Sequence, residues 1–444
     1  MPKLIKCGLD PIDRVLMPFT RFFKTQSSGG VLLIGCAVLA LLWANSPWAG
    51  SYERLWTTPF TVGYGPAMLQ KPLLLWVNDG LMALFFFVVG LEIKREFMVG
   101  ELSTVSQALL PIVAAAGGMV APAAIYALIN GSGPGGQGWG VPMATDIAFA
   151  LGILALLGDR VPVQLKVFLT AVAIVDDIGA VLVIALFYTS SISTWLLLAA
   201  AAGLAVAFAG NRMGVRTPVF YAVVGAVVWV LVLKSGVHST VAGVLMAFAI
   251  PARTRCEPEG FITGAGRLLD EYRSALEPGS SVLTNAGIHS ALLSIDDLAT
   301  RAQTPLQRLE HSLHPVVEYA IMPVFALANA GVVLGGGAGP VLANPVSLGV
   351  VAGLVLGKPL GVVLAVWGVA ALSGGLPAGL RMRHFAGVGM LAGIGFTMSL
   401  FIAALAFEGD PALLAGAKIG VLGASCLAGA AGYLLLRGLP AVKA

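Results

Sequence analysis

Four charged residues lie within stretches of the sequence that are otherwise apolar. They are Asp146 in A-T-D-I-A-F-A-L-G, the adjacent Asp176 and Asp177 in A-I-V-D-D-I-G-A, and Lys358 in G-K-P-L-G. Carboxylates are the hard oxygen ligands that small cations prefer. Burial in a low-dielectric cavity also favours the protonated form of a carboxyl group. The same group can therefore hold a proton or a metal cation, which predicts a site where the two compete.

Helix geometry separates the two adjacent aspartates. Consecutive residues are offset by about 100° around a helix, so we expect one of Asp176 and Asp177 to face the ion and the other to meet a partner. Lys358 is the cation that the apolar stretches offer for that role. The alternative is that these groups form buried ion pairs that only hold helices together. Three aspartates and one lysine near one depth favour the ion site.

The composition places these residues in a membrane. Of 444 residues, 58% are hydrophobic and 11% are charged, against about 25% charged in a soluble domain. The mean hydropathy is +0.90. A soluble enzyme, a disordered chain and a nucleic-acid-binding protein are excluded, because too few polar residues are present to cover a water-exposed surface. The four scattered cysteines predict neither a disulfide framework nor a metal site.

Twelve apolar stretches are long enough, or nearly so, to cross a hydrocarbon core about 30 Å thick. We therefore expect an all-α polytopic membrane protein with lipid around it. The stretches cover residues 29–45, 72–97, 107–129, 140–157, 163–188, 194–210, 218–234, 237–251, 314–334, 346–372, 385–407 and 411–436.

The basic residues predict the orientation. With the N-terminus in the cytoplasm, 21 of the 26 lysines and arginines fall on the cytoplasmic side. Arg54, Lys71, Lys234 and Lys418 fall outside, and Lys358 lies within a stretch. Because cytoplasmic loops carry an excess of basic residues, this distribution predicts an even number of spans and two cytoplasmic termini.

Three segments lie outside the stretches. Residues 12–23 have helical apolar spacing with basic residues among them, which predicts a helix in the cytoplasmic interface. Residues 55–70 predict a small external hairpin. Residues 252–311 predict a long cytoplasmic loop with one or two surface helices, between spans 1–8 (residues 1–251) and spans 9–12 (residues 312–444) of one membrane unit. The apolar residues of the first segment are Ile12, Val15, Leu16, Phe19, Phe22 and Phe23.

Glycine and proline interrupt two of the stretches. The fourth opens with Pro142 and is broken near Thr145 and Asp146, and the eleventh reads G-V-G-M-L-A-G-I-G-F-T-M-S. Backbone that leaves the helix at membrane depth is tolerated only where it lines a cavity or is buried in protein. The two stretches are the middle members of spans 3–5 and 10–12. Discontinuous spans at matching places predict a transporter built from inverted repeats.

These residues resemble a known family. The chain is similar to the NhaA sodium/proton antiporters of bacterial inner membranes, an inverted-repeat fold. The similarity covers almost the whole chain in order. The matching stretches are N-D-G-L-M-A-L-F-F-F-V-V-G-L-E-I-K-R-E (78–96), A-T-D-I-A-F-A-L-G (144–152), A-I-V-D-D-I-G-A (173–180), L-K-S-G-V-H-S-T-V-A-G (233–243), L-E-H-S-L-H-P (309–315), P-V-F-A-L-A-N-A-G-V (323–332), G-K-P-L-G (357–361) and G-I-G-F-T-M-S (393–399).

The resemblance implies roles at the ion site. Asp176 and Asp177 would bind Na⁺, with Asp177 the direct ligand. Lys358 would pair with Asp176 and offset the dipoles of the broken helices. Thr145 and Asp146 would lie where the two interrupted spans cross.

The resemblance also implies a cytoplasmic group linked to the response to pH, with two further positions elsewhere. From the residues alone there are plainer alternatives: a solvated helix start for the histidines, and a surface salt-bridge cluster for the glutamates of 92–96. The group is Glu92, Arg95, Glu96, Glu310, His311 and His314, and the further positions are His238 and the external Asp79.

Two features depart from the family pattern. The loop 252–311 is longer than the corresponding connection in the family members, and Glu318 is an unexpected acidic residue in the ninth stretch. Neither touches the ion-site motifs, but both could alter the response to pH.

The expected activity is electrogenic exchange of cytoplasmic Na⁺ or Li⁺ for external H⁺ by alternating access, in a bacterial inner membrane and by a homodimer. No G-x-x-x-x-G-K-[ST] motif occurs, so we expect no ATP, no cofactor and no catalytic residue, and a transporter rather than an enzyme. Two alternatives have less support. An intramembrane aspartyl protease would need a G-x-G-D motif, which is absent, and a Na⁺-coupled symporter of an organic solute would need more polar groups than the spans offer.

Overall fold

The computed structural model describes residues 28–63, 68–189, 192–276, 283–333, 344–373, 375–377 and 379–439. In this part the chain is mostly helical, with one two-stranded sheet. The interfacial helix predicted at 12–23 lies outside the described residues.

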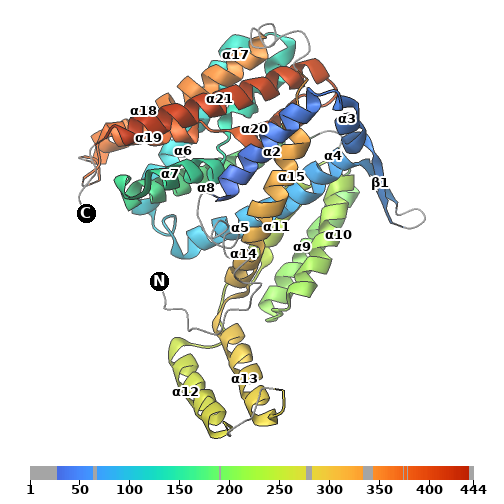
Figure 1. Cartoon of the computed structure of the whole chain (residues 1–444), viewed down its shortest axis with the longest axis vertical. Coiled ribbons are helices and arrows are strands. Elements are labelled where there is room, and N and C mark those ends of the chain that lie inside the picture. Colours follow the sequence, from blue (N-terminus) through green and yellow to red (C-terminus); the bar gives the residue numbers. More distant parts are fainter. Residues whose placement is uncertain are drawn as a thin grey trace.

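The first part of the chain, up to the long loop, holds the two strands and most of the longer helices (Figure 1). In chain order the elements are α2 (Ser28–Ala44), α3 (Ala49–Thr57), β1 (Pro59–Val62), β2 (Leu69–Pro72), α4 (Leu73–Leu75), a π-helical turn (Trp76–Leu81), α5 (Met82–Val99), α6 (Val105–Asn130), a 3-10 helix (Pro134–Met143), α7 (Ile147–Leu157), a 3-10 turn (Gly158–Arg160), α8 (Val163–Phe187), α9 (Thr194–Arg212), α10 (Pro218–Lys234) and α11 (Thr240–Ala249).

The second part begins with a helical hairpin outside the main body and returns to apolar helices. In chain order the elements are α12 (Pro258–Ser274), α13 (Ala286–Ala302), α14 (Pro305–Val316), a π-helical turn (Val317–Ile321), α15 (Met322–Asn329), α17 (Pro345–Ala352), a π-helical turn (Gly353–Gly357), α18 (Lys358–Ser373), α19 (Met382–Ala392), α20 (Phe396–Ala406) and α21 (Pro411–Arg437).

The helices are those of a multi-pass membrane protein. The described residues contain six helices long and apolar enough to cross a membrane, or nine if each of three bent helix pairs is one span. Helices α10 and α11 are apolar but shorter. Each of the twelve predicted stretches coincides with one of these elements or with the stretch 305–329. That all twelve cross the membrane stays a prediction.

One predicted boundary was wrong, and one predicted stretch is preceded by additional helix. The hairpin predicted at 55–70 occupies 59–72, where Pro59 pairs with Pro72, and residues 55–57 end helix α3. The helix that leads into the predicted apolar stretch 314–334 begins at Pro305, because Thr304 caps it by accepting a hydrogen bond from the Gln307 N–H at 3.1 Å. Pro305 suits the first helical position, where no N–H partner is needed.

The predicted surface helices of the long loop are present as α12 and α13. They pack side by side and project from the rest of the molecule (Figure 1). The Arg255 N–H donates to the Arg301 carbonyl at 3.0 Å, so the start of α12 lies beside the end of α13. The two helices are therefore antiparallel.

Close packing of α6 against α18 positions the lysine predicted for the ion site. A Cβ atom at Gly117 or at Gly361 would overlap the backbone of the other helix, so only glycine allows this approach. Lys358 begins α18, and its aliphatic stem passes Gly118 at 3.9 Å from where a Cβ would lie. Helices α17 to α21 and α6 to α8 form one group in Figure 1, and α9 and α10 lie at the opposite edge.

Candidate ion-binding site

Two breaks in the helices meet at the centre of the candidate site. The 3-10 helix 134–143 and α7 are bent by 42° at one break, and α19 and α20 are bent by 48° at the other. The Asp146 N–H donates to the Ile394 carbonyl at 2.7 Å, and the Thr145 hydroxyl donates to the Ala392 carbonyl at 2.9 Å. Each break therefore satisfies backbone groups that the other leaves free.

One carboxylate caps two helices at this crossing. Asp146 Oδ1 accepts the Phe149 N–H at 3.0 Å, in the first turn of α7. Its Oδ2 accepts the Thr397 N–H at 3.2 Å and the Thr397 hydroxyl at 2.5 Å, in the first turn of α20. Helix N-termini carry partial positive charge and unpaired N–H groups. The position and charge of Asp146 therefore stabilise both helix ends, while only 1% of the residue is exposed.

Lys358 binds a carboxylate and a backbone carbonyl at the same crossing. Its ammonium lies 2.7 Å from Asp176 Oδ2, and both side chains are fully buried. It also donates to the carbonyl of Met143, the last residue of the 3-10 helix. The Thr145 hydroxyl oxygen also lies 2.7 Å from this Asp176 oxygen, so its one hydrogen is shared between Asp176 and the Ala392 carbonyl. The ammonium thus offsets one carboxylate and one helix C-terminus.

Asp177 differs from the other two aspartates. It is 2% exposed, and its Oδ1 has no hydrogen-bond partner within the part of the chain that the structure describes. The same holds for Asp176 Oδ1. A buried charge without a partner is costly. Two free carboxylate oxygens on neighbouring residues form a donor set that suits a small hard cation or a proton.

The charges of the site do not balance. Asp146, Asp176, Asp177 and Lys358 are all at most 2% exposed. If all four are ionised, they carry two excess negative charges in a low-dielectric interior. This arrangement is stable only when protons or cations bind to it.

Some residues of the group that the resemblance links to the pH response are in contact in the structure. Arg95 on α5 lies 3.0 Å from Glu96 and also forms an ion pair with Glu310 on α14. Glu92 lies one turn before Glu96 on α5. His311 on α14 is exposed.

The two other predicted histidines make contacts outside that group. His314 lies 3.6 Å from Glu318, which also accepts a hydrogen bond from the Gly29 N–H in the first turn of α2. His238 is in the turn before α11, where its Nε2 lies 2.6 Å from the Tyr188 carbonyl. It is not part of the group on α5 and α14, because that group lies by the opposite end of α11.

The structure adds residues that the sequence analysis did not single out. Thr397 and Ser399 lie in the quoted G-I-G-F-T-M-S motif, and Ser399 donates to the Val141 carbonyl at 2.7 Å. Only their hydroxyl groups within an apolar break could have marked them in the sequence. Asp79, which the resemblance had already indicated, pairs with Lys71 of β2 at 2.7 Å, and this contact joins the hairpin to the π-helical turn.

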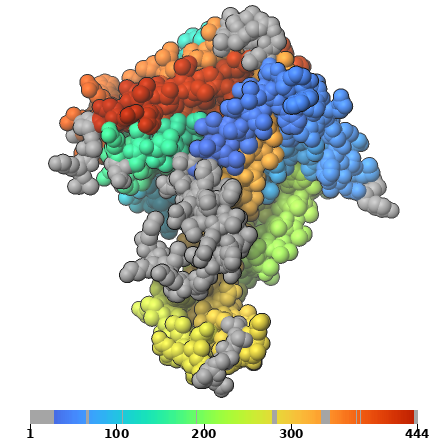
Figure 2. Space-filling model, in the orientation of Figure 1, coloured from blue at the N-terminus to red at the C-terminus, as the bar shows by residue number. Residues whose placement is uncertain are grey.

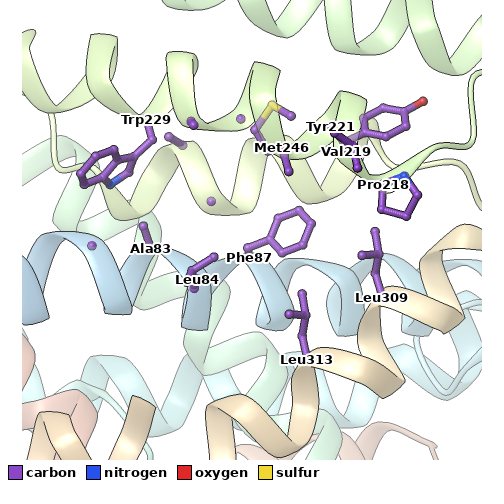
Figure 3. A pocket seen from close by; sticks show the side chains of 16 residues that line it. Ala83, Leu84, Phe87, Pro218, Val219, Tyr221, Trp229, Met246, Leu309 and Leu313 are labelled. Carbon is purple, nitrogen blue, oxygen red and sulfur yellow. The ribbon is translucent and has the colours of Figure 1, made fainter. Parts of the chain in front are cut away.

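A cavity of about 600 Å³ lies elsewhere, between α5, α10, α11 and α14 (Figure 3). Its lining is apolar and includes Phe87, Met246 and Leu313, and it contains none of the four charged groups. Two polar groups at its edge are already paired, since Tyr221 donates to the Val215 carbonyl and Trp229 to the Asp79 carbonyl. The cavity therefore offers no charged partner for a polar organic solute.

Comparison with known proteins identifies the family. The family model described as Na+/H+ antiporter 1 matches residues 20–436. The chain belongs to this family. The resemblance seen in the sequence is thereby confirmed.

Three relatives illustrate how far the similarity extends. The Na(+)/H(+) antiporter NhaA of Oleidesulfovibrio alaskensis is 54% identical over 432 residues, which cover 96% of this chain and 95% of the relative. That of Rhodospirillum rubrum is 50% identical over 430 residues, covering 95% and 97%. That of Koribacter versatilis is 48% identical over 427 residues, covering 96% and 92%. Proteins with these names are transporters rather than enzymes.

Proposed function

We propose that the protein exchanges cytoplasmic Na⁺, or Li⁺, for external H⁺, and that the exchange takes place at Asp176 and Asp177. The observation that carries the proposal is the buried Asp177 carboxyl, whose Oδ1, like that of Asp176, has no hydrogen-bond partner among the described residues. Membership of the Na+/H+ antiporter family supports the choice of ions.

The chemistry of exchange follows from two states of one site. In the first, a proton occupies Asp177 and a second proton resides on Asp176 or Lys358. In the second, Na⁺ is held by the two carboxylates, and these protons have left. More than one H⁺ for one Na⁺ moves net charge, so the exchange is electrogenic and the membrane potential and proton gradient can drive it.

The crossing of the breaks supplies the fixed frame for this exchange. Thr145 and Asp146 hold the two interrupted helices together, and Lys358 compensates Asp176 and the 3-10 helix C-terminus. We propose that these are discontinuous spans 4 and 11 of two inverted repeats, spans 3–5 and 10–12. Alternating access would then open this site to one side of the membrane at a time.

We further propose twelve spans with both termini in the cytoplasm of a bacterial inner membrane. The distribution of basic residues supports this orientation. The exposed Phe60 and Val62 of the external hairpin, at 51% and 46%, support a homodimer formed through β1 and β2. The ion pair of Arg95 with Glu310 and the neighbouring Glu92 support regulation by pH at the cytoplasmic end of α5.

Proton movement in inside-out vesicles tests the proposal. Vesicles from a host without its own antiporters would be acidified by respiration and given Na⁺, Li⁺ or K⁺ between about pH 6.5 and 8.5. We expect Na⁺ and Li⁺ to alkalinise the lumen and K⁺ not to do so. The Asp177→Asn variant should lose the response, and Asp410→Asn, in an exposed helix cap, should keep it. An unchanged response in Asp177→Asn would refute the site, and no cation response in the inserted wild type would refute the exchange.

An uptake assay addresses the symporter. Na⁺-dependent accumulation of a solute would favour it, but no contact in the described residues provides a polar solute site.

A further inference from the structure

The hairpin of α12 and α13 has an apolar face against which none of the described residues packs closely. It lies at the foot of the molecule, below the helical body (Figure 2). Ile262 and Leu269 lie seven residues apart on α12 and are 70% and 48% exposed, and Leu276, just after α12 ends at Ser274, is 53% exposed. On α13, Leu292 is 39% exposed. Apolar groups at helical spacing on a hairpin outside the membrane-spanning helices indicate a contact surface.

Ile262, Leu269 and Leu292 lie on one side of the hairpin. Leu269 follows the buried Leu268 on α12, and Leu292 follows the buried Ala291 on α13. Successive helical residues are offset by about 100° around the helix axis. Leu269 and Leu292 are therefore each turned by this angle, in the same sense about their own helix axes, from the buried residue that faces the other helix. Because the helices are antiparallel, the same rotation turns both side chains to the same side. The other side carries polar residues, such as the exposed Thr263.

We propose that the N-terminal segment 12–23 of the same chain packs its apolar residues on this face rather than in the membrane interface. As a helix, the segment would carry Ile12, Leu16 and Phe19 on one side. Such an apolar side could pack against the apolar face of the hairpin. The proposal is independent of the proposed ion exchange.

The connection of the segment to α2 supports this occupant. Ser28 begins α2, and its hydroxyl lies 2.8 Å from that of Tyr319. Tyr319 is 14 residues after Pro305, or about 20 Å along the helix from the base of the hairpin at 1.5 Å per residue. If residues 24–27 were extended, they would span at most about 14 Å, and residues 12–23 as a helix would span about 18 Å. Together these lengths exceed the distance to the base of the hairpin.

The charges of the two segments favour the N-terminal segment, rather than a second copy of the hairpin, as the partner of this face. Residues 1–27 have five basic and two acidic residues, whereas residues 258–302 have three basic and six acidic residues. The two are therefore oppositely charged. Two hairpins would bring like charges together, which disfavours their pairing.

Cross-linking tests the proposal in the full-length protein. The four native cysteines would be replaced by serine, and Leu16→Cys combined with Ile262→Cys or, as a matched control, with Thr263→Cys. The two partner positions are adjacent but lie on opposite sides of the hairpin. In inside-out vesicles we expect the Ile262 pair to cross-link within one chain about tenfold more than the Thr263 pair, because docking raises the effective concentration. Peptide mass spectrometry would identify the link.

A protease measurement covers the case in which the cysteine variants do not assemble. Trypsin cleavage at Arg14 and Arg21 should be about tenfold faster in Ile262→Asp than in Thr263→Asp, since cleavage follows the population of the undocked segment. Equal cleavage and equal or absent cross-links would overturn the proposal. A link between two chains would indicate a second copy instead. Quenching of a Phe19→Trp variant by brominated lipid, without a cross-link, would place the segment on the membrane.

Discussion

Removal of the buried lysine should destabilise the fold by an amount that the structure allows us to estimate. Lys358→Met would leave Asp176 without its ammonium partner, now 2.7 Å away and fully buried. Breaking a buried ion pair from one side costs about 3–5 kcal/mol. With an unfolding entropy near 2.1 cal/mol/K per residue, the thermal midpoint of a chain this long should fall by about 3–5 °C.

A double variant separates the ion pair from other effects of the substitution. Asp176→Asn with Lys358→Met removes both charges, so its midpoint should fall by less than the two single changes added together. Thermal unfolding in detergent, followed by fluorescence, would measure all three variants. Lys71→Met serves as control, because its pair with Asp79 is 28% and 18% exposed and such pairs contribute up to about 1 kcal/mol. A midpoint unchanged in Lys358→Met, or strictly additive losses, would refute the reasoning.

Three further predictions concern contacts around the site. Thr397→Val should lower the free energy of unfolding by about 1.5–3 kcal/mol, because Asp146 loses a hydroxyl donor at 2.5 Å. Thr397→Ser keeps the hydroxyl and should keep most of that stability in the same unfolding assay. An equal loss in both variants would contradict this prediction. Glu318→Ala should lower the free energy of unfolding by about 1 kcal/mol, because it removes the acceptor at the α2 N-terminus. Glu318→Gln keeps an acceptor oxygen and should lower it less. Equal losses in the two variants would contradict capping of α2 by Glu318. Arg95→Gln and Glu310→Gln should each shift the pH profile of exchange in the vesicle assay. The profile of the double variant should be closer to wild type, because it leaves no unpaired charge. If the shift in the double variant equals the sum of the two single shifts, the two residues do not act as a pair.

The sequence predicted the charged groups of the site and the places where the helices break. Charge at membrane depth and proline or glycine within a span are local signals with a high energetic cost, so they identify Asp146, Asp177 and Lys358 without a structure. The shared capping of α7 and α20 by Asp146 was not predictable. It depends on Thr397, 251 residues away along the chain, and no local pattern records such a contact.

Boundaries and π-helical turns were the weaker part of the prediction. The helix start at Pro305 had a signal in Thr304, but hydropathy alone placed the span at the apolar residues further on. The turns 76–81, 317–321 and 353–357 contain or directly precede Asp79, Glu318 and Lys358. Such turns often occur at functional positions, yet tertiary packing rather than composition produces them.

Competition between Na⁺ and H⁺ for one buried carboxyl pair is measured most directly by calorimetry on the purified protein. Na⁺ would be titrated in two buffers of different ionisation enthalpy, so that the number of protons released on binding is obtained. The account predicts proton release upon Na⁺ binding in the wild type and the loss of both in Asp177→Asn. Sodium binding without proton release, or unchanged binding in Asp177→Asn, would contradict it.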